Sequence, residues 1–215
     1  MAYSLVVDLE FEFASGLHVG GEEAKLRVDK AVAVDWRDGK TPVIPATTLK
    51  GWLRESAERI LRGLGVKVCD PSSTGGICGR CVICKIFGAS LIRSRIYFSD
   101  AVLAGSMTDV RMNVSLNRRR KTAFEERLFS TEVAWKSTIN SQIKGWFSSE
   151  EEALRGAAIL IAAAKTGYAI GGARSRGLGW LQLNKWTVKV QDKEIPREEV
   201  LNQILALKAR PEVAS

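Results

Sequence analysis

Apolar and polar residues alternate along residues 5–13, where Leu5 and Phe11 fall on one side and Asp8 on the other. A period of two residues is typical of a strand with one buried face. The pattern therefore predicts a half-buried strand near the start of the sequence. Further strands are expected in "RIYFSDAVLAG", residues 95–105, and in "WLQLNKWTVKV", residues 180–190.

Apolar residues recur at helical spacing from Leu49 to Leu64. This spacing predicts a helix that begins near Thr47 or Thr48, after a proline, and ends near Gly65.

A second helix is expected in "SSEEEALRGAAILIAAAKTG". Ser149 and Glu152 have the spacing of a capping box at its start, and Gly167 is suited to its end. A terminal helix is predicted over residues 196–209, with proline near its first turn.

The predicted elements follow the order strand, helix, strands, helix, glycine-rich loop, strand. This is the βαββαβ order of a ferredoxin-like (RRM-like) α+β fold. We expect one domain over residues 1–215, because no linker, internal repeat or low-complexity segment interrupts the sequence. Two segments are expected as insertions: a cysteine-rich segment, 69–84, and a long β-hairpin, 111–137, with "RMNVSL" and "LFSTEVAW" as arms. Helices on one face of the sheet leave the other face open, and RNA-recognition folds bind RNA there.

The formal charge is +8 and the isoelectric point about 9.5, with basic clusters in "NRRRK" and "RSR". Such a surface favours acidic partners, nucleic acid above all, although general basicity for solubility is the alternative. No stretch reaches the ~18 apolar residues of a membrane span, and no signal peptide is visible. We therefore expect a cytoplasmic protein without a membrane partner, whose cysteines are reduced unless they bind something.

All four cysteines lie in one short segment, "CDPSSTGGICGRCVIC". Four thiolates can close a tetrahedral zinc site and so stabilise a polar loop that has no core of its own. The sequence therefore predicts a structural Zn²⁺ site. An iron–sulfur cluster is the competing interpretation, because consecutive C-x2-C-x2-C also occurs in ferredoxins. The predicted ligands are Cys69, Cys78, Cys81 and Cys84.

The stretch "GGARSRGLGW" places glycines beside Arg174 and Arg176. Glycine lets another backbone approach closely, and the planar guanidinium suits phosphate oxygens. The stretch therefore indicates a loop that wraps a polyanion, although a surface turn with two solvated arginines fits equally well. The glycines of this loop are Gly171, Gly172, Gly177 and Gly179.

Lys50 and Arg54 stand four residues apart at the start of the first predicted helix, with Gly51 between them. Helix N-termini attract anions, so this pair is predicted to contact phosphates. A solvated helix face is the alternative.

Five motifs occur here in a set order: "SGLHVGG", "IPATTLKGWLR", "CVICKIFGAS", "RIYFSDA" and "GGARSRGLGW". The ordered set resembles the RAMP superfamily, specifically the backbone subunit of type III CRISPR RNA-guided complexes (the Csm kind). The resemblance runs from about residue 5 to residue 186. It implies a ferredoxin-like fold, guide crRNA and target RNA as ligands, the other subunits of the effector complex as partners, and self-association as a filament.

The resemblance also implies site residues. In "DKAVAVD", Asp29 and Asp35 have the spacing of the family's cleavage loop, so Asp29 is the expected catalytic residue, with Mg²⁺ or Mn²⁺ for RNA cleavage. The usual proline after the first aspartate is missing. In the hairpin, Arg118 matches the family arginine, while Lys121 replaces a usual glycine and Asn117 a usual aspartate. Phe124 and Leu128 are candidate wedges against bases. The expected RNA-binding residues are His18, Lys50, Arg54, Arg118, Arg174 and Arg176.

Three other functions are open at this point. The first is a crRNA-binding scaffold that does not cleave. The second is a metal-independent RAMP endoribonuclease that processes precursor crRNA with His18 as general acid or base. The third is a redox iron–sulfur protein.

Overall fold

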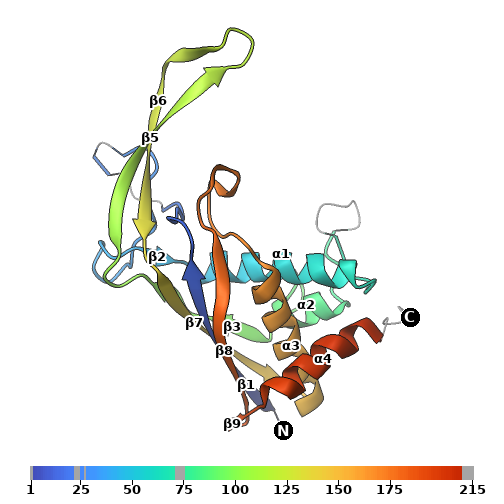
Figure 1. Ribbon diagram of the computed structural model, residues 1–215. Coiled ribbons are helices and arrows are strands. Elements are labelled where there is room, and N and C mark those ends of the chain that lie inside the picture. Colours follow the sequence, from blue (N-terminus) through green and yellow to red (C-terminus); the bar gives the residue numbers. More distant parts are fainter. Residues whose placement is uncertain (1, 22–24, 27, 71–75, 210–215) are drawn as a thin grey trace.

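The computed structural model describes residues 2–21, 25–26, 28–70 and 76–209 (Figure 1). The predicted cysteine-rich insertion is described except for residues 71–75. The strands are β1 (Tyr3–Phe13), β2 (Val43–Ile44), β3 (Ile96–Phe98), β4 (Ala101–Val102), β5 (Met107–Asn117), β6 (Thr122–Trp135), β7 (Thr138–Phe147), β8 (Leu181–Val190) and β9 (Lys193–Glu194). The helices are α1 (Ala46–Gly63), α2 (Val82–Phe87), α3 (Glu150–Thr166) and α4 (Arg197–Ala209), and a 3₁₀ turn covers Arg174–Arg176.

A five-stranded antiparallel sheet, in the order β3-β7-β1-β8-β9, forms the centre of the molecule. The alternation in β1 places Leu5, Val7, Leu9 and Phe11 in the core, as the sequence predicts. Helices α1 and α3 pack against each other on this buried face, and α4 packs on α3 (Figure 1). The mixed α+β class with antiparallel sheets is thus confirmed. The finer ferredoxin-like assignment stays a prediction here.

Strand β7 lies beside β1 at the middle of the sheet and was not predicted. Its inward positions include Ser141 and Gly145, which break the apolar alternation set by Ile139, Ile143 and Phe147. The glycine is needed because an added Cβ would stand 3.0 Å from the Phe147 ring and 3.1 Å from Ile96. Close packing therefore removed the hydrophobic signal that identifies a strand.

The single strand expected over residues 95–105 is wrong in detail. Residues Ser99 and Asp100 separate β3, which joins the main sheet, from β4, which pairs with β2. The Asp100 carboxylate accepts the backbone N–H of Ala46 at 2.7 Å, so the break supplies a partner for the first turn of α1.

The hairpin of β5 and β6 projects far from the sheet (Figure 1). Its arms are longer than expected. At its tip the Asn117 side-chain oxygen accepts the N–H groups of Arg119 and Arg120, both at 3.1 Å. Lys121 has a φ of 55°, a left-handed conformation that glycine adopts more easily than lysine.

The helix boundaries largely follow the expected caps. The Ser149 hydroxyl accepts the N–H of Glu152 at 3.2 Å, and Gly167 follows the last turn of α3, as predicted. The α1 helix begins one or two residues earlier than expected, directly after Pro45, and Leu64 rather than Gly65 is its C-cap residue.

Candidate nucleic-acid interface and metal centre

The four cysteine sulfurs converge between α1 and α2. All four Sγ atoms lie within 4.8 Å of one another. The Sγ of Cys69 is 3.4 Å from that of Cys84 and 3.7 Å from that of Cys81. Sulfurs bound tetrahedrally at a Zn–S distance of ~2.3 Å stand roughly 3.8 Å apart, so this set fits a single zinc-sized ion. In a four-iron cluster each thiolate binds a different iron, which requires wider spacing.

The thiols have unequal surroundings. Backbone N–H groups of Cys81 and Arg80 point at the exposed Cys78 sulfur and lower its pKa to about 6. Burial raises the pKa of Cys84 to about 12 and also raises the pKa of Cys69. A bound cation would offset the cost of ionising these buried thiols.

A charged ladder on α1 holds the cysteine segment in place. The buried carboxylate of Glu58 accepts from Arg54 at 3.0 Å and from Arg62 at 3.4 Å. Arg54 also donates to the carbonyl of Gly88 at 2.9 Å and lies 3.9 Å from the Cys84 sulfur. Arg62 donates to the Cys69 carbonyl at 3.3 Å. The two arginines thus bind both ends of the cysteine segment, and Arg54 places positive charge beside the Cys84 sulfur.

These contacts bear on the predicted role of Arg54 in phosphate binding. Its side chain is only 19% exposed, and three of its donor nitrogens already have protein partners. Its predicted phosphate contact stays a prediction, but the geometry favours a role in holding the metal site. Lys50, one turn earlier, is half-buried, and burial together with Arg54 lowers its pKa.

The glycine-rich loop docks on the backbone around His18. The N–H of Gly172 donates to the His18 carbonyl at 2.7 Å. A Cβ on Gly171 would stand 2.4 Å from that same oxygen, and a Cβ on Gly179 would stand 1.9 Å from the Ile170 oxygen. Both glycines have positive φ, 88° and 73°. These positions therefore require glycine for close approach and for conformation, whereas Gly177 meets nothing within 4 Å.

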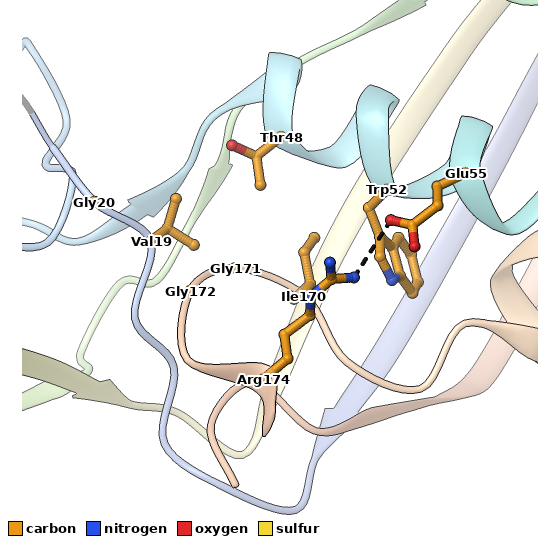
Figure 2. Close-up of a pocket in the computed structure, with 9 residues that line it drawn as sticks. All are labelled: Val19, Gly20, Thr48, Trp52, Glu55, Ile170, Gly171, Gly172 and Arg174. Carbon is orange, nitrogen blue, oxygen red and sulfur yellow. Dashed lines mark hydrogen bonds and ion pairs between the residues drawn. The ribbon is translucent and has the colours of Figure 1, made fainter. Parts of the chain in front are cut away.

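A groove of about 330 Å³ opens between this loop and the start of α1 (Figure 2). Arg174 reaches across it to Glu55 on α1, at 3.3 Å. The first turn of α1 has no acidic residue of its own and its N-cap residue makes no side-chain hydrogen bond, although the Asp100 carboxylate accepts the N–H of Ala46. The lining residues are Val19, Gly20, Thr48, Trp52, Glu55, Ile170, Gly171, Gly172 and Arg174.

His18 is a structural residue in this arrangement. It is 8% exposed, and its Nδ1 hydrogen-bonds the carbonyl of Glu132 at 2.8 Å. A Cβ on Gly172 would stand 3.0 Å from its ring. The ring therefore packs between the hairpin base and the glycine-rich loop, a position poorly suited to a freely exchanging general acid or base.

Asp29 is exposed and is anchored to β6. Its Oδ2 accepts from the backbone N–H of Ser130 at 2.7 Å and from the Ser130 hydroxyl at 2.8 Å. The N–H of Asp29 donates to the same hydroxyl at 2.8 Å. The backbone bond first, and the hydroxyl bond second, lower the pKa of this carboxyl. Asp29 is thus a fixed, ionised carboxylate at the base of the hairpin.

Asp35 plays a different part. Its carboxylate accepts from the N–H and the guanidinium of Arg37, at 3.0 and 3.3 Å, inside a tight turn. The side chain is only 12% exposed. Asp29 and Asp35 are therefore not equivalent, and of the two only Asp29 presents its carboxylate to the surface.

Sequence reasoning missed the residues that hold the Asp29 loop. The buried Glu132 carboxylate accepts from Lys25 at 2.9 Å and from the N–H of Val32 at 3.0 Å, and so ties the loop to β6. One signal was available: Ser130 and Glu132 are polar residues at alternate positions in the last arm of the hairpin. Their burial depends on a loop about 100 residues earlier in the chain, which no local pattern reveals.

The predicted arginines fall into two groups. Arg118 lies at the exposed tip of the hairpin, and Arg174 and Arg176 lie in the 3₁₀ turn of the glycine-rich loop. The structure therefore separates the basic hairpin tip from the groove, where Arg174 pairs with Glu55. The RNA contacts of these residues stay predictions.

The chain combines an α+β fold with antiparallel sheets, a groove beside α1 and a cluster of four thiols. A family model, RAMP superfamily, matches residues 10–182, and the chain belongs to that superfamily. A search of curated proteins gives no match. Membership indicates a CRISPR-associated RNA-binding function, with RNA and CRISPR complexes as partners, and RAMP proteins are often nucleases. Within the described residues no helix is long and apolar enough to cross a membrane.

Proposed function

We propose that this chain is the guide-RNA-binding backbone subunit of a type III CRISPR effector complex. In this proposal it assembles as a filament on the crRNA and cleaves the bound target RNA at regular intervals, with Asp29 as the catalytic residue. Family membership supports RNA binding in a CRISPR context.

The observation that carries the proposal is a series of backbone hydrogen bonds that connects the groove to the loop of Asp29. Residues 17–20 accept the glycine-rich loop at His18 on one side. On the other side Leu17 exchanges hydrogen bonds with Ala134 of β6, and Val19 accepts the N–H of Ala33 at 2.8 Å. Backbone hydrogen bonds therefore connect the groove to residues 30–33 beside Asp29 and to the hairpin base. RNA bound in the groove would therefore lie on the same hydrogen-bonded part of the fold that positions the Asp29 carboxylate.

Asp29 suits a metal-assisted cleavage role chemically. A hard cation such as Mg²⁺ binds through one or two carboxylates and keeps several waters, so a single exposed carboxylate is sufficient. Such a cation, when bound, supplies electrostatic stabilisation of charge on the scissile phosphate. The part of Asp29 is to stay ionised and fixed, which its bonds to Ser130 support.

The order and pairing of the core elements support a ferredoxin-like assignment. Strands β1, β3, β7 and β8 alternate with α1 and α3 in the order β1-α1-β3-β7-α3-β8, and the sheet order is β3-β7-β1-β8. This is a βαββαβ arrangement with both helices on one face.

The test is an assembled complex with labelled target RNA. Asp29→Ala should abolish cleavage and leave target binding nearly unchanged, because one surface carboxylate contributes little to affinity for an anion. Asp35→Ala is the matched control and should keep cleavage if its turn still folds. Excess EDTA should stop cutting, and Mg²⁺ or Mn²⁺ should restore it.

Two outcomes would overturn parts of the proposal. Cutting at the wild-type rate by the Asp29→Ala variant, or in excess EDTA, removes Asp29 and the metal from the mechanism. If the unaltered complex binds target and never cuts it, the chain is a crRNA-binding scaffold. Processing of precursor crRNA without metal is the remaining alternative, and the buried ring of His18 argues against it.

A further inference from the structure

The face of the sheet opposite α1 and α3 is divided into two halves of different chemistry. The half nearer the hairpin is acidic, with the outward side chains of Asp8, Glu10 and Glu12 along β1. Each of these carboxylates has partners on neighbouring strands, such as Gln142 at 2.8 Å from Asp8 and Asn184 at 2.8 Å from Glu10. A row of acids repels phosphates. This half therefore does not suit RNA.

The half farther from the hairpin is aromatic and basic. Tyr97 lies opposite Lys144 in the register of β3 and β7, and Trp146 is the next outward residue along β7. The rings of Tyr97 and Trp146 meet edge to face with centroids 5.4 Å apart. The Arg93 guanidinium lies over the Tyr97 ring, 5.8 Å from its centroid.

These side chains remain open to solvent. Tyr97 is 42% exposed and Trp146 is 50% exposed, although each ring already covers part of the other. Arg93 and Lys144 make no ion pair with any residue in the described ranges. Single exposed aromatic residues are common on protein surfaces. Two rings in contact, with two unpaired cations beside them, are the elements of a nucleotide site.

We propose that Arg93, Tyr97, Lys144 and Trp146 bind single-stranded nucleic acid, with a base stacked on the rings and phosphates on the cations. Aromatic side chains on an open sheet face are one general way to hold unpaired bases. This site is separate from the groove, because the outward side chains of β3 and β7 lie on the sheet face opposite α1 (Figure 1). The inference goes beyond the proposed function and requires neither cleavage nor a filament.

The experiment measures binding of a fluorescent oligouridine of roughly eight nucleotides, within the range of site sizes for single-strand binding surfaces. The starting protein is the full chain carrying Lys50→Ala and Arg174→Ala, which weakens the groove. Adding Trp146→Ala should reduce affinity a further ~5-fold or more, because stacking of one base is lost. Trp146→Phe, which keeps a ring, should restore most of the binding, and Tyr97→Ala should resemble Trp146→Ala.

Glu10→Gln on the acidic half of the same face is the matched control, and it should bind no more weakly than the starting protein. All patch variants should stay folded, with melting temperatures within a few degrees of the starting protein, because the altered side chains are at least two-fifths exposed. Equal affinity of the Trp146→Ala and starting proteins for the oligonucleotide would overturn the inference. If that variant instead lowers the molar mass measured by sedimentation, the patch is a contact between copies. Neither result depends on whether Asp29 cleaves RNA.

Discussion

At the scale of single residues, the two hydrogen bonds from Ser130 keep Asp29 ionised. They lower its pKa from the ordinary value of 3.8. A depressed carboxyl pKa means that the interaction contributes stability above the unfolded-state pKa and that this contribution is lost as pH falls through the folded-state pKa. The Asp29–Ser130 contact should therefore persist throughout the neutral range and weaken only in acid.

Ser130→Ala should raise the Asp29 pKa only part of the way to its ordinary value. The larger cause of the shift is the backbone N–H, which the substitution leaves in place. NMR titration of the side-chain carboxyls measures this. The pKa of Asp38, held at about 2 by Thr41, is the internal control and should not move. A full return of Asp29 to its ordinary pKa would show that the backbone bond is lost as well.

The glycine-rich loop gives a second prediction at this scale. Gly179→Ala combines positive φ with a Cβ placed 1.9 Å from the Ile170 oxygen, so it should cost about 2–4 kcal/mol of the free energy of unfolding. Gly177→Ala has positive φ but open space, and it should cost only about 1–2 kcal/mol. Denaturant unfolding of the two variants checks the difference. Equal losses would mean that the loop moves away from residue 170 without cost.

The sequence indicated which side chains form a site more reliably than it indicated what those side chains contact. The four cysteines were recognised as one site because thiols close together in sequence are close in space. Lys50 and Arg54 were treated as a matching pair because the helix places them on one face. Arg54 is nonetheless enclosed by Glu58 and Gly88. The second of these partners comes from a distant segment, and a helical spacing rule cannot indicate it.

At the scale of secondary-structure elements, local pattern succeeded where one face of an element is uniformly apolar. Strand β1 and helix α1 were predicted for this reason. Strand β7 was missed because its buried face includes Ser141 and Gly145, which interrupt the apolar alternation, and Gly145 packs closely against Ile96 and Phe147. Local pattern also failed to predict part of the candidate site, because Glu132 and Ser130 bind a loop about 100 residues away in the sequence.

The ladder on α1 leads to a prediction about metal retention. Arg54→Ala should release zinc from the four-cysteine site ~10-fold faster or more, as is typical when an outer-shell partner is removed. The physical reason is the loss of positive charge 3.9 Å from the Cys84 sulfur and of the bond to Gly88. A colorimetric chelator competition measures the release. Cys81→Ser should lose zinc outright and lower the melting temperature.

Arg59→Ala on the same helix is the matched control for this prediction, since Arg59 contacts Ser56 and Tyr168 rather than the cysteine segment. Its zinc release should equal that of the unaltered protein. If Arg54→Ala keeps zinc normally and weakens RNA binding as much as Lys50→Ala does, the phosphate-binding interpretation of Arg54 is correct instead.

At the scale of the whole molecule, acidic and basic side chains lie on different surfaces and are not spread evenly. The net charge of +8 includes an acidic row on the open sheet face, so the remaining surface is more basic than the average. Basic residues gather at the hairpin tip, and Arg174 and Arg176 lie in the glycine-rich loop beside the groove. The side that carries α1, the glycine-rich loop and the hairpin is therefore one surface that attracts a polyanion, separate from the patch of Arg93 and Lys144 on the open sheet face.

This distribution predicts how salt affects RNA binding. Lys50→Ala and Arg174→Ala should each weaken binding of all RNA sequences to a similar extent, because phosphate contacts carry no base information. Each should also reduce the slope of log affinity against log salt concentration by about one unit or less. The value for Arg174 should be the smaller, since part of its charge is already offset by Glu55 at 3.3 Å. Lys193→Ala, on the far edge strand β9, is the control and should leave both affinity and slope unchanged. A variant that altered preference among RNA sequences, with the slope constant, would show that the groove reads bases rather than the backbone.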